Sequence, residues 1–202
     1  MRPLNDLTDL IAEFPGVGPR QARRIVQFLL SKDKSFRARA AELIQKVGDH
    51  LTRCNSCFRF DEVNESGMCA ICVDPARDAT ALMVVEKDVD IESIEAAHAY
   101  SGRYFVLGGL IPMAKQRRNG NTVRVKELLA RIAKSKKNGL REVVLALSTT
   151  PEGDYTALET AKNIVDAEPG MKVTLLGRGL STGAELEYAD RETLRNALKN
   201  RA

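Results

Sequence analysis

Four cysteines, the only ones in the 202-residue chain, fall in two closely spaced pairs. Cys54 and Cys57 form one C-x2-C pair, and Cys69 and Cys72 form a second pair after eleven intervening residues. Four thiolates from such pairs make a closed tetrahedral metal site, which is structural rather than catalytic. Buried or redox-active thiols are the alternative, which the absence of any further cysteine disfavours. The spacing therefore predicts one Zn²⁺ per chain, whose binding supplies folding energy to a stretch with few apolar residues.

After the cysteines, apolar runs alternate with helical patterns. The expected strands are continuous apolar runs at residues 81–85, 104–107, 142–147 and 172–176. The expected helices repeat their apolar residues with a helical period at residues 91–99, 123–136, 155–167 and 191–198. Strands that alternate with helices predict a three-layer α/β domain with a parallel or mostly parallel sheet.

Before the cysteines, three helical patterns predict a small helical unit. The first covers residues 4–12, the second follows residue 19, and the third covers residues 35–51 with an apolar stripe of its own. The turn PGVGP at residues 15–19 separates the first two. Its glycines permit positive φ and close backbone approach, and the next helix begins with free N–H groups that bind phosphate.

Three arginines follow this turn directly. Arg20, Arg23 and Arg24 lie in the first two turns of the second helix, where positive charge opposes the helix dipole unless an anion is bound. The pattern is typical of a helix-hairpin-helix element, which holds a DNA backbone without reading the bases. An ordinary helical corner built on a tight glycine turn is the alternative.

The net charge of +4 is too small to identify a partner, but the charges are unevenly distributed. Residues 1–53 hold ten basic and six acidic side chains. Residues 113–141 hold ten basic side chains and one acidic one, and the last twelve residues hold four basic side chains and one acidic one. Residues 54–112 and 142–190 are acidic. Separate basic blocks can face a polyanion, while acidic blocks hold metal or a basic partner; solvated helix faces are the alternative.

The composition narrows the class of protein further. The chain is 44% hydrophobic and 29% charged, so it can form a core and stay soluble. No apolar run approaches the 18 residues of a membrane span, and the first residues lack a signal-peptide core. We therefore expect a cytoplasmic protein without a membrane partner.

Carboxylates follow two of the expected strands. Glu86 ends one strand and is followed by Asp90, while Glu152 and Asp154 follow the strand at residues 142–147. Because the ends of parallel strands gather at one edge of a sheet, these side chains can converge and hold Mg²⁺. Helix N-capping is the alternative, above all for Asp90 and Asp154.

Taken in order, the glycine hairpin, the four-cysteine knuckle and the acidic α/β domain resemble the bacterial recombination mediator RecR family nearly end to end. The stretches that carry the resemblance are PGVGPRQARR, CNSC with CAIC, VVEKDVDIESIE, SGRYFVLGG, EVVLALSTTPEGDYTA and RGLSTGAELEYADRETLRNAL. The resemblance implies a helix-hairpin-helix DNA-binding unit over residues 1–53 and a four-cysteine zinc finger over residues 54–76. It also implies a Toprim α/β domain over residues 77–177 and a C-terminal segment with subunit contacts over residues 178–202.

The resemblance also assigns roles to basic and C-terminal residues. Arg20 and Arg24 fall where the family has its DNA-contacting side chains, and Arg23 is an extra charge beside them. The four cysteines fall on the zinc ligands. The C-terminal signature, which in the family contributes to subunit contacts, contains Gly179, Gly183 and Glu185.

Among the acidic residues, Glu86 falls on the Toprim glutamate, with Asp90 just after it. Glu152 and Asp154 fall on a second acidic pair, although Asp154 stands where a glutamate is usual. The chain also has Ser148-Thr149-Thr150-Pro151 where the family commonly has Asn-Pro before that pair. The basic stretch at residues 114–119 replaces a glycine-rich loop, and it adds charge that can contact DNA.

Members of the family are non-enzymatic mediators of recombinational DNA repair that act with the proteins RecO and RecF. They assemble as rings of four subunits and help load RecA onto single-stranded gaps. The resemblance therefore implies sequence-independent binding of single- and double-stranded DNA at the nucleoid. The competing interpretation is a Mg²⁺-dependent Toprim nuclease or primase-like enzyme that uses Glu86, Glu152 and Asp154. A purely structural zinc adaptor would leave the basic blocks unexplained.

Overall fold

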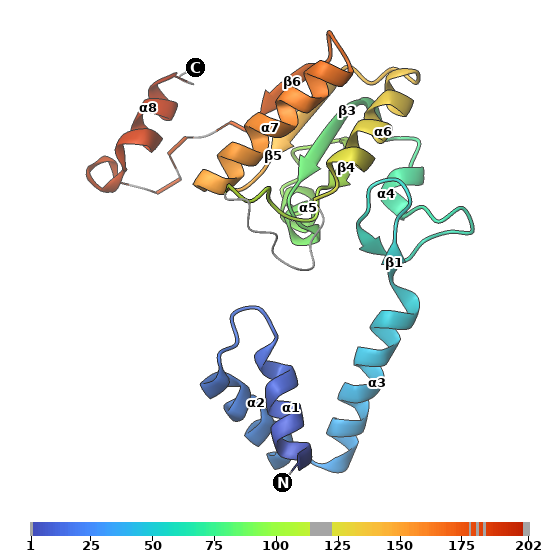
Figure 1. Ribbon diagram of the computed structural model, residues 1–202, viewed down its shortest axis with the longest axis vertical. Coiled ribbons are helices and arrows are strands. Elements are labelled where there is room, and N and C mark those ends of the chain that lie inside the picture. The colour runs from blue at the N-terminus through green and yellow to red at the C-terminus, as the bar shows by residue number, and fades with distance from the viewer. Residues whose placement is uncertain (1, 114–122, 178, 181, 184, 200–202) are drawn as a thin grey trace. The chain divides into compact units, whose positions relative to one another are not determined.

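The computed structural model describes residues 2–113, 123–177, 179–180, 182–183 and 185–199 (Figure 1). The chain divides into two compact units, Met1–Thr52 and Arg53–Ala202. No helix in the described ranges is long and apolar enough to cross a membrane.

The first unit consists of three helices, as the sequence predicts: α1 (Arg2–Ala12), α2 (Pro19–Ser31) and α3 (Lys34–His50). Its small core forms where α1 and α2 pack together around the buried residues Ile11, Ala22 and Val26. Helix α2 starts sharply because Gly18 is its N-cap and proline occupies the first turn, where no intrahelical N–H is needed. The glycine hairpin thus joins two helices that pack together, and it leaves the start of α2 without a side-chain cap.

Helix α3 forms where the sequence predicts it, but its apolar stripe is not covered. None of its residues is buried among the described parts of the chain. The four large apolar side chains of this stripe are between 42% and 74% exposed: Phe36, Leu43, Ile44 and Val47. An apolar stripe of this size normally packs against another surface.

The second unit is built on a four-stranded sheet of order β4-β3-β5-β6. The strands are β3 (Asp78–Val85), β4 (Gly102–Val106), β5 (Glu142–Ala146) and β6 (Lys172–Leu175). Every neighbouring pair is parallel, which confirms the predicted parallel sheet. Strand β3 is central and continuously buried over its last four residues, so its apolar run packs on both faces.

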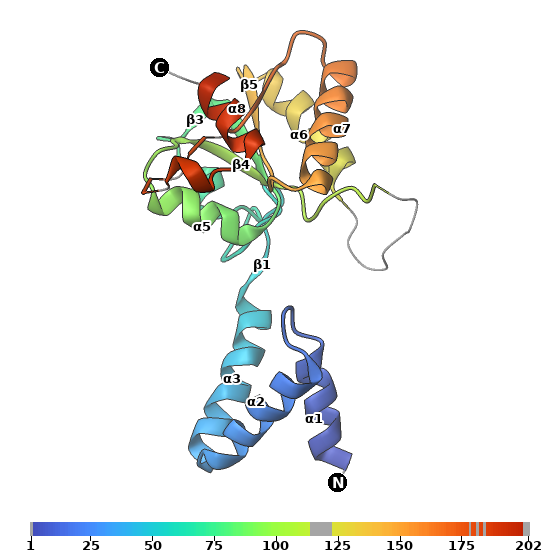
Figure 2. The same ribbon diagram turned by 90° about the vertical axis from the view of Figure 1, so that its left-hand side faces the viewer.

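Helices cover both faces of this sheet. Helices α6 (Val125–Lys136) and α7 (Pro151–Ala167) lie side by side on one face, and α5 (Asp88–Ala96) lies on the other (Figure 2). The larger core, on the α6 and α7 face, contains Leu82, Val84, Phe105, Leu128, Ile132 and Ile164. The smaller core, on the α5 face, contains Met83, Val85, Ile91, Tyr104 and Val106. The layers are those predicted from the alternation of strands and helices.

Short elements complete the fold. The cysteine region contains β1 (Thr52–Arg53), β2 (Phe60–Asp61) and α4 (Ala70–Val73). After β6, the chain forms a 3₁₀ turn, η1 (Leu186–Tyr188), and α8 (Arg191–Lys199), which extends the predicted helix by one residue.

Two predicted helix starts were wrong. Helix α5 begins at Asp88 rather than at residue 91, and α7 begins at Pro151 rather than at residue 155. In α7 the hydroxyl of Thr150 accepts a hydrogen bond from the Gly153 N–H at 3.1 Å, so the helix is capped before the acidic residues. Glu152 and Asp154 therefore belong to the first turn of α7 and not to a loop.

Gly153 is the residue that lets α7 begin so close to β5. A Cβ atom at this position would lie 1.8 Å from the carbonyl oxygen of Ser148, a backbone atom in the short connection between β5 and α7. We expect Gly153→Ala to lower the free energy of unfolding by about 1–3 kcal/mol through this overpacking. Urea unfolding of both proteins measures the difference.

Gly48→Ala is the matched control, because Gly48 lies within α3 and a Cβ there would meet nothing within 4 Å. That change is expected to stabilise the helix by about 0.5–1 kcal/mol. Equal stability of the parent and the Gly153→Ala protein would contradict the close approach of α7 to residue 148.

Candidate metal centre and charged surfaces

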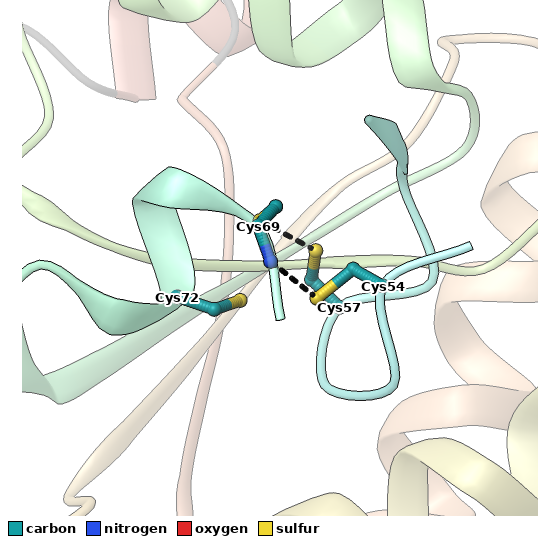
Figure 3. A group of neighbouring side chains, drawn as sticks. All are labelled: Cys54, Cys57, Cys69 and Cys72. Atoms are coloured by element: carbon teal, nitrogen blue, oxygen red, sulfur yellow. Dashed lines mark hydrogen bonds between the residues drawn. The ribbon is translucent and has the colours of Figure 1, made fainter. Parts of the chain in front are cut away.

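The four cysteines come from two short segments of the second unit that fold toward each other (Figure 3). Cys54 and Cys57 lie in the turn between β1 and β2, while Cys69 is the N-cap of α4 and Cys72 lies inside it. The loop between the pairs is closed by backbone hydrogen bonds, including one from the Asn55 N–H to the Gly67 carbonyl at 2.8 Å. All four thiols are at least 94% buried. As predicted, the structure brings the four side chains together.

Their geometry fits a tetrahedral metal ion. The four Sγ atoms all lie within 4.8 Å of one another, and those of Cys57 and Cys69 are 3.6 Å apart. A tetrahedron with metal–sulfur bonds of about 2.3 Å has sulfur–sulfur edges of about 3.8 Å. Two backbone N–H groups, those of Ser56 and Cys69, donate to the Cys54 sulfur at 3.4 and 3.3 Å. Such donors stabilise a thiolate, which is the form that binds metal.

The four thiols also change one another's pKa. Hydrogen bonding with Cys57 is the main cause that lowers the pKa of Cys54, and the same contact raises the pKa of Cys57. Four thiols packed this closely cannot all ionise without a cation, because like charges in a buried site raise one another's pKa. A divalent ion removes this conflict, so the donor set is chemically suited to a soft or borderline metal.

The cysteine region is fastened to the sheet by its own backbone. The carbonyl of Cys57 accepts a hydrogen bond from the Val106 N–H of β4 at 2.8 Å, and the Phe60 N–H donates to the Asp88 carboxylate at 2.7 Å. The ring of Phe58 packs on that of Phe105, with 5.4 Å between centroids. Because β4 is an edge strand, the knuckle satisfies backbone groups that would otherwise be open for pairing.

A second link between the cysteine region and the α5 face runs through Arg77. Its guanidinium makes two hydrogen bonds to the Glu95 carboxylate, which also accepts one from the Tyr104 hydroxyl. The bond from Arg77 is the main cause that holds the pKa of Glu95 below its ordinary value of 4.5. Because the folded-state pKa is depressed, the stabilisation is complete above pH 4.5 and is lost as the pH falls through the folded value.

We expect Glu95→Gln to lower the free energy of unfolding at pH 7 by about 1–2 kcal/mol, because a mostly buried guanidinium loses its charged partner. The variant is also expected to show a weaker fall in stability below pH 4.5 than the parent. Urea unfolding at pH 7 and at a series of acidic pH values measures both effects. Glu92→Gln is the control, because Glu92 is exposed on the same helix, and equal effects of the two changes would contradict this role.

The three hairpin arginines are all exposed at the start of α2. None of their guanidinium groups has a hydrogen bond or an ion pair within the part of the chain that the structure describes. Arg20 and Arg24 are one turn apart and so share a face of the helix. Arg23 instead lines a groove of about 390 Å³ between α1 and α2, together with Asp9. The structure therefore separates Arg23 from the other two.

The acidic residues do not form a metal cluster of the kind made by the cysteines. Glu86 is 91% buried at the end of β3 and pairs with Lys87, whose Nζ lies 3.0 Å from its Oε1. The Asp90 carboxylate accepts a hydrogen bond from the Lys87 N–H at 2.8 Å, which is the capping role. Glu152 and Asp154 are exposed in the first turn of α7. Among the described residues, the four cysteines are the only group of three or more such side chains that can hold an ion.

The C-terminal signature and the basic stretch at residues 114–119 are the two remaining regions to which the sequence assigns a role. In the C-terminal signature, Gly183 has a positive φ of 82° and Glu185 is the N-cap of η1. Three residues of this segment are highly exposed apolar side chains, Leu186, Tyr188 and Leu198. The basic stretch at residues 114–119 lies outside the described residues.

The prediction from sequence missed the cap that fixes the second acidic pair. Thr150 followed by Pro151 is a readable helix start, because threonine favours the N-cap and proline the first helical position. This signal would have placed Glu152 and Asp154 on α7. The packing of the cysteine region on β4 carries no comparable signal in the sequence.

Comparisons with known proteins agree with these features. The family model described as the Toprim domain matches residues 80–177, and the one described as RecR, C-terminal, matches residues 179–202. Recombination protein RecR of Chlorobium chlorochromatii (strain CaD3) is 38% identical over 199 residues, which are 98% of this chain and 95% of that protein. Recombination protein RecR of Nocardia farcinica (strain IFM 10152) is 38% identical over 201 residues, which are 98% of this chain and 96% of that protein. The predicted α/β Toprim fold, with N-terminal helices and a four-cysteine knuckle, is thereby confirmed.

Proposed function

Because the chain belongs to the RecR family of recombination proteins, we propose that it is a DNA-binding mediator of recombinational repair. In this role it helps load RecA onto single-stranded gaps coated with single-strand binding protein. It acts there with RecO-like and RecF-like partners, in the cytoplasm at the nucleoid. It is not itself an enzyme.

One observation carries the DNA-binding part of this proposal. Arg20 and Arg24 are exposed on one face at the start of α2, next to a helix terminus without a side-chain cap. No described acidic side chain neutralises them. Backbone N–H groups and guanidinium groups at such a site suit phosphate, and the site offers nothing that distinguishes one base from another. Binding to single- and double-stranded DNA is therefore independent of sequence.

We propose that the ion in the cysteine site is one Zn²⁺ per chain. Four buried sulfur ligands with a closed geometry favour a structural zinc ion over Mg²⁺ or Ca²⁺, which prefer oxygen ligands. The zinc finger (54–76) is one part of the domain organisation that we propose. The other parts are the hairpin unit (1–53), the Toprim domain (77–177) and the C-terminal segment (178–202).

The acidic residues have a different role in this proposal. Glu86, Glu152 and Asp154 bind a basic surface of a RecO-like partner, or Mg²⁺, with Asp90 beside them. Glu86 pairs with Lys87, and Glu152 and Asp154 lie exposed in the first turn of α7. Among the described residues these carboxylates do not gather around one ion, as two-metal chemistry requires. The alternative function, a Mg²⁺-dependent Toprim nuclease or primase-like enzyme, has in its favour the match to the Toprim domain.

Self-association into a ring of four subunits is supported by uncovered apolar surface. In the first unit, the stripe on α3 contains Ile44, which is 74% exposed, and Val47, which is 58% exposed. In the second unit, the C-terminal segment exposes Tyr188 and Leu198. Surfaces of this kind mark protein interfaces, and identical subunits can bury them against each other. Analytical ultracentrifugation measures the number of subunits directly.

Assembly of RecA on gapped DNA tests the mediator role. The DNA is first coated with single-strand binding protein, and the reaction contains the RecO-like protein of the same organism. The parent protein is expected to accelerate RecA assembly, and the Arg20→Ala/Arg24→Ala protein is expected not to. If the parent leaves the rate unchanged, the mediator role is wrong.

A further inference from the structure

A small basic cavity lies between β4 and α6, apart from the cysteine site and from the acidic strand ends. Its volume is about 40 Å³. Its charged and polar lining comes from Arg103, Arg131, Lys134, Ser135 and Asn138, and the rest of its lining is apolar and comes from three residues of β3 and from Leu140. No acidic residue is among the residues that line it. Neither the metal site nor the hairpin uses any of these side chains, so the cavity needs an explanation of its own.

Arg103 is directed into this region by the register of the sheet. It pairs with Leu82 of β3, and it shares its face of β4 with Phe105, two residues further on. That face is covered by α6. The charged side chain of Arg103 therefore occupies a position at which the alternation along the strand predicts an apolar side chain. The following residues of the same face, Phe105 and Leu107, are fully buried.

Arg131 approaches from the helix that covers this face. It lies on α6 between Leu128 and Ile132, both fully buried in the core between helix and sheet. Two partly buried guanidinium groups therefore border one cavity, with Lys134 one turn of the helix further on. Like charges that border one cavity repel each other, and an anion bound between them removes that repulsion.

Hydrogen bonding gives a second, independent indication. The Nε atoms of Arg103 and Arg131 are both buried, and neither has an acceptor among the described protein atoms. A buried N–H group without an acceptor costs about 1–3 kcal/mol, more when the group is charged. Asp78, at the start of β3, instead accepts from the N–H and hydroxyl of Thr80 at 2.8 and 2.7 Å.

We propose that this cavity is a binding site for an oxyanion of the phosphate class. Two guanidinium groups supply paired N–H donors in the planar geometry that suits phosphate oxygens, and the Lys134 ammonium adds a third positive charge. A water molecule needs about 10–15 Å³ on the same measure, so the cavity admits a group of a few atoms and not a base. The phosphate comes either from free phosphate or from a DNA strand.

Arginine Nε–H resonances in the nuclear magnetic resonance spectrum of the full chain test this site. Inorganic phosphate is titrated at constant ionic strength and pH, with chloride as the replacement salt. The signals of Arg103 and Arg131 are expected to shift with a saturable midpoint. In Arg131→Gln the apparent Kd for phosphate, followed on Arg103, is expected to rise about tenfold or more. Lys134→Gln, which changes an exposed side chain and preserves the core, is expected to weaken binding as well.

Lys126→Gln is the matched control, because it removes one charge from an exposed position of α6 that does not line the cavity. Its Kd is expected to equal that of the parent. Absence of a saturable shift in the parent, or an unchanged Kd in both Arg131→Gln and Lys134→Gln, would overturn the proposal. In that case the arginines only protect the edge strand β4 from pairing with another chain.

A second titration, with a single-stranded oligonucleotide, identifies the source of the phosphate. It is carried out on the Arg20→Ala/Arg24→Ala protein, so that the hairpin does not contribute. If the oligonucleotide shifts the same two Nε–H signals and inorganic phosphate reverses the shift, the natural ligand is a DNA phosphate. If only inorganic phosphate shifts them, the ligand is a free phosphate group. The site is therefore tested separately from DNA binding at the hairpin.

Discussion

Replacing Cys57 by serine is expected to unfold the cysteine region and to destabilise the whole Arg53–Ala202 unit. A ligand set of this kind binds a structural metal with a free energy of about 10–16 kcal/mol in small zinc domains, which is comparable with the entire stability of a typical domain. The effect spreads to the sheet because Cys57 also carries the carbonyl that accepts from Val106 at the edge of β4. Removal of zinc from the parent by a chelator is expected to have the same consequence.

Metal analysis and thermal unfolding measure this prediction together. The parent is expected to contain one zinc per chain, and Cys57→Ser is expected to contain far less and to unfold at a much lower temperature. Ser66→Ala is the matched control, since this exposed residue lies in the loop between the cysteine pairs and ligates nothing. A parent protein that is fully folded with far less than one zinc per chain would contradict the metal site.

The double change Arg20→Ala/Arg24→Ala is expected to weaken DNA binding to all sequences alike. Each arginine that neutralises one phosphate contributes about 0.9 to the slope of log affinity against log salt on duplex DNA, and about 0.7 on single strands. Losing both contacts therefore lowers the slope by about 1.8 and about 1.4, respectively. Because both side chains are exposed, the free energy of unfolding is expected to change by less than about 0.5 kcal/mol.

Fluorescence anisotropy over a range of salt concentrations measures both slopes. Arg39→Ala is the control, because Arg39 is exposed on α3 and its replacement removes one charge without touching the hairpin. Arg23→Ala is expected to weaken DNA binding less than Arg20→Ala or Arg24→Ala alone, since Arg23 lines the groove between α1 and α2. A double variant that binds as tightly as the parent at every salt concentration would show that the hairpin is only structural.

How far the sequence predicts the structure depends on whether a feature is local. The cysteine spacing predicts the metal site because both pairs lie within one short loop. The strands that are apolar throughout predict the parallel sheet because both faces of β3 are buried. The starts of α5 and α7 were misplaced because apolar periodicity does not report caps, although Thr150 and Pro151 were a local signal for one of them.

Features that depend on distant segments could not be predicted. The stripe on α3 has the helical period of a packed face, yet the described chain leaves Ile44 and Val47 exposed. Periodicity indicates that a face is apolar, and it does not identify what covers that face. Likewise, Arg103 and Arg131 are 28 positions apart and come together only through the strand register and the packing of α6.

For the acidic residues, the sequence predicts which strand ends are adjacent but not which partners the carboxylates take. Strand order does place the ends of β3 and β5 side by side, as the sequence predicts. The side chains then take local partners: Glu86 pairs with Lys87, and Asp90 caps α5. Adjacent strand ends are thus insufficient to predict a metal cluster, because helix caps and neighbouring lysines compete for the same carboxylates.

Incubation of the protein with labelled DNA and Mg²⁺ tests the central claim most directly. The assay follows binding and strand cleavage in the same samples, with the Glu86→Gln/Glu152→Gln protein beside the parent. We predict that both proteins bind DNA and that neither changes it, with the variant binding equally well or slightly better because repulsion is removed. Mg²⁺-dependent cleavage by the parent that disappears in the variant would contradict the mediator and establish the Toprim enzyme instead.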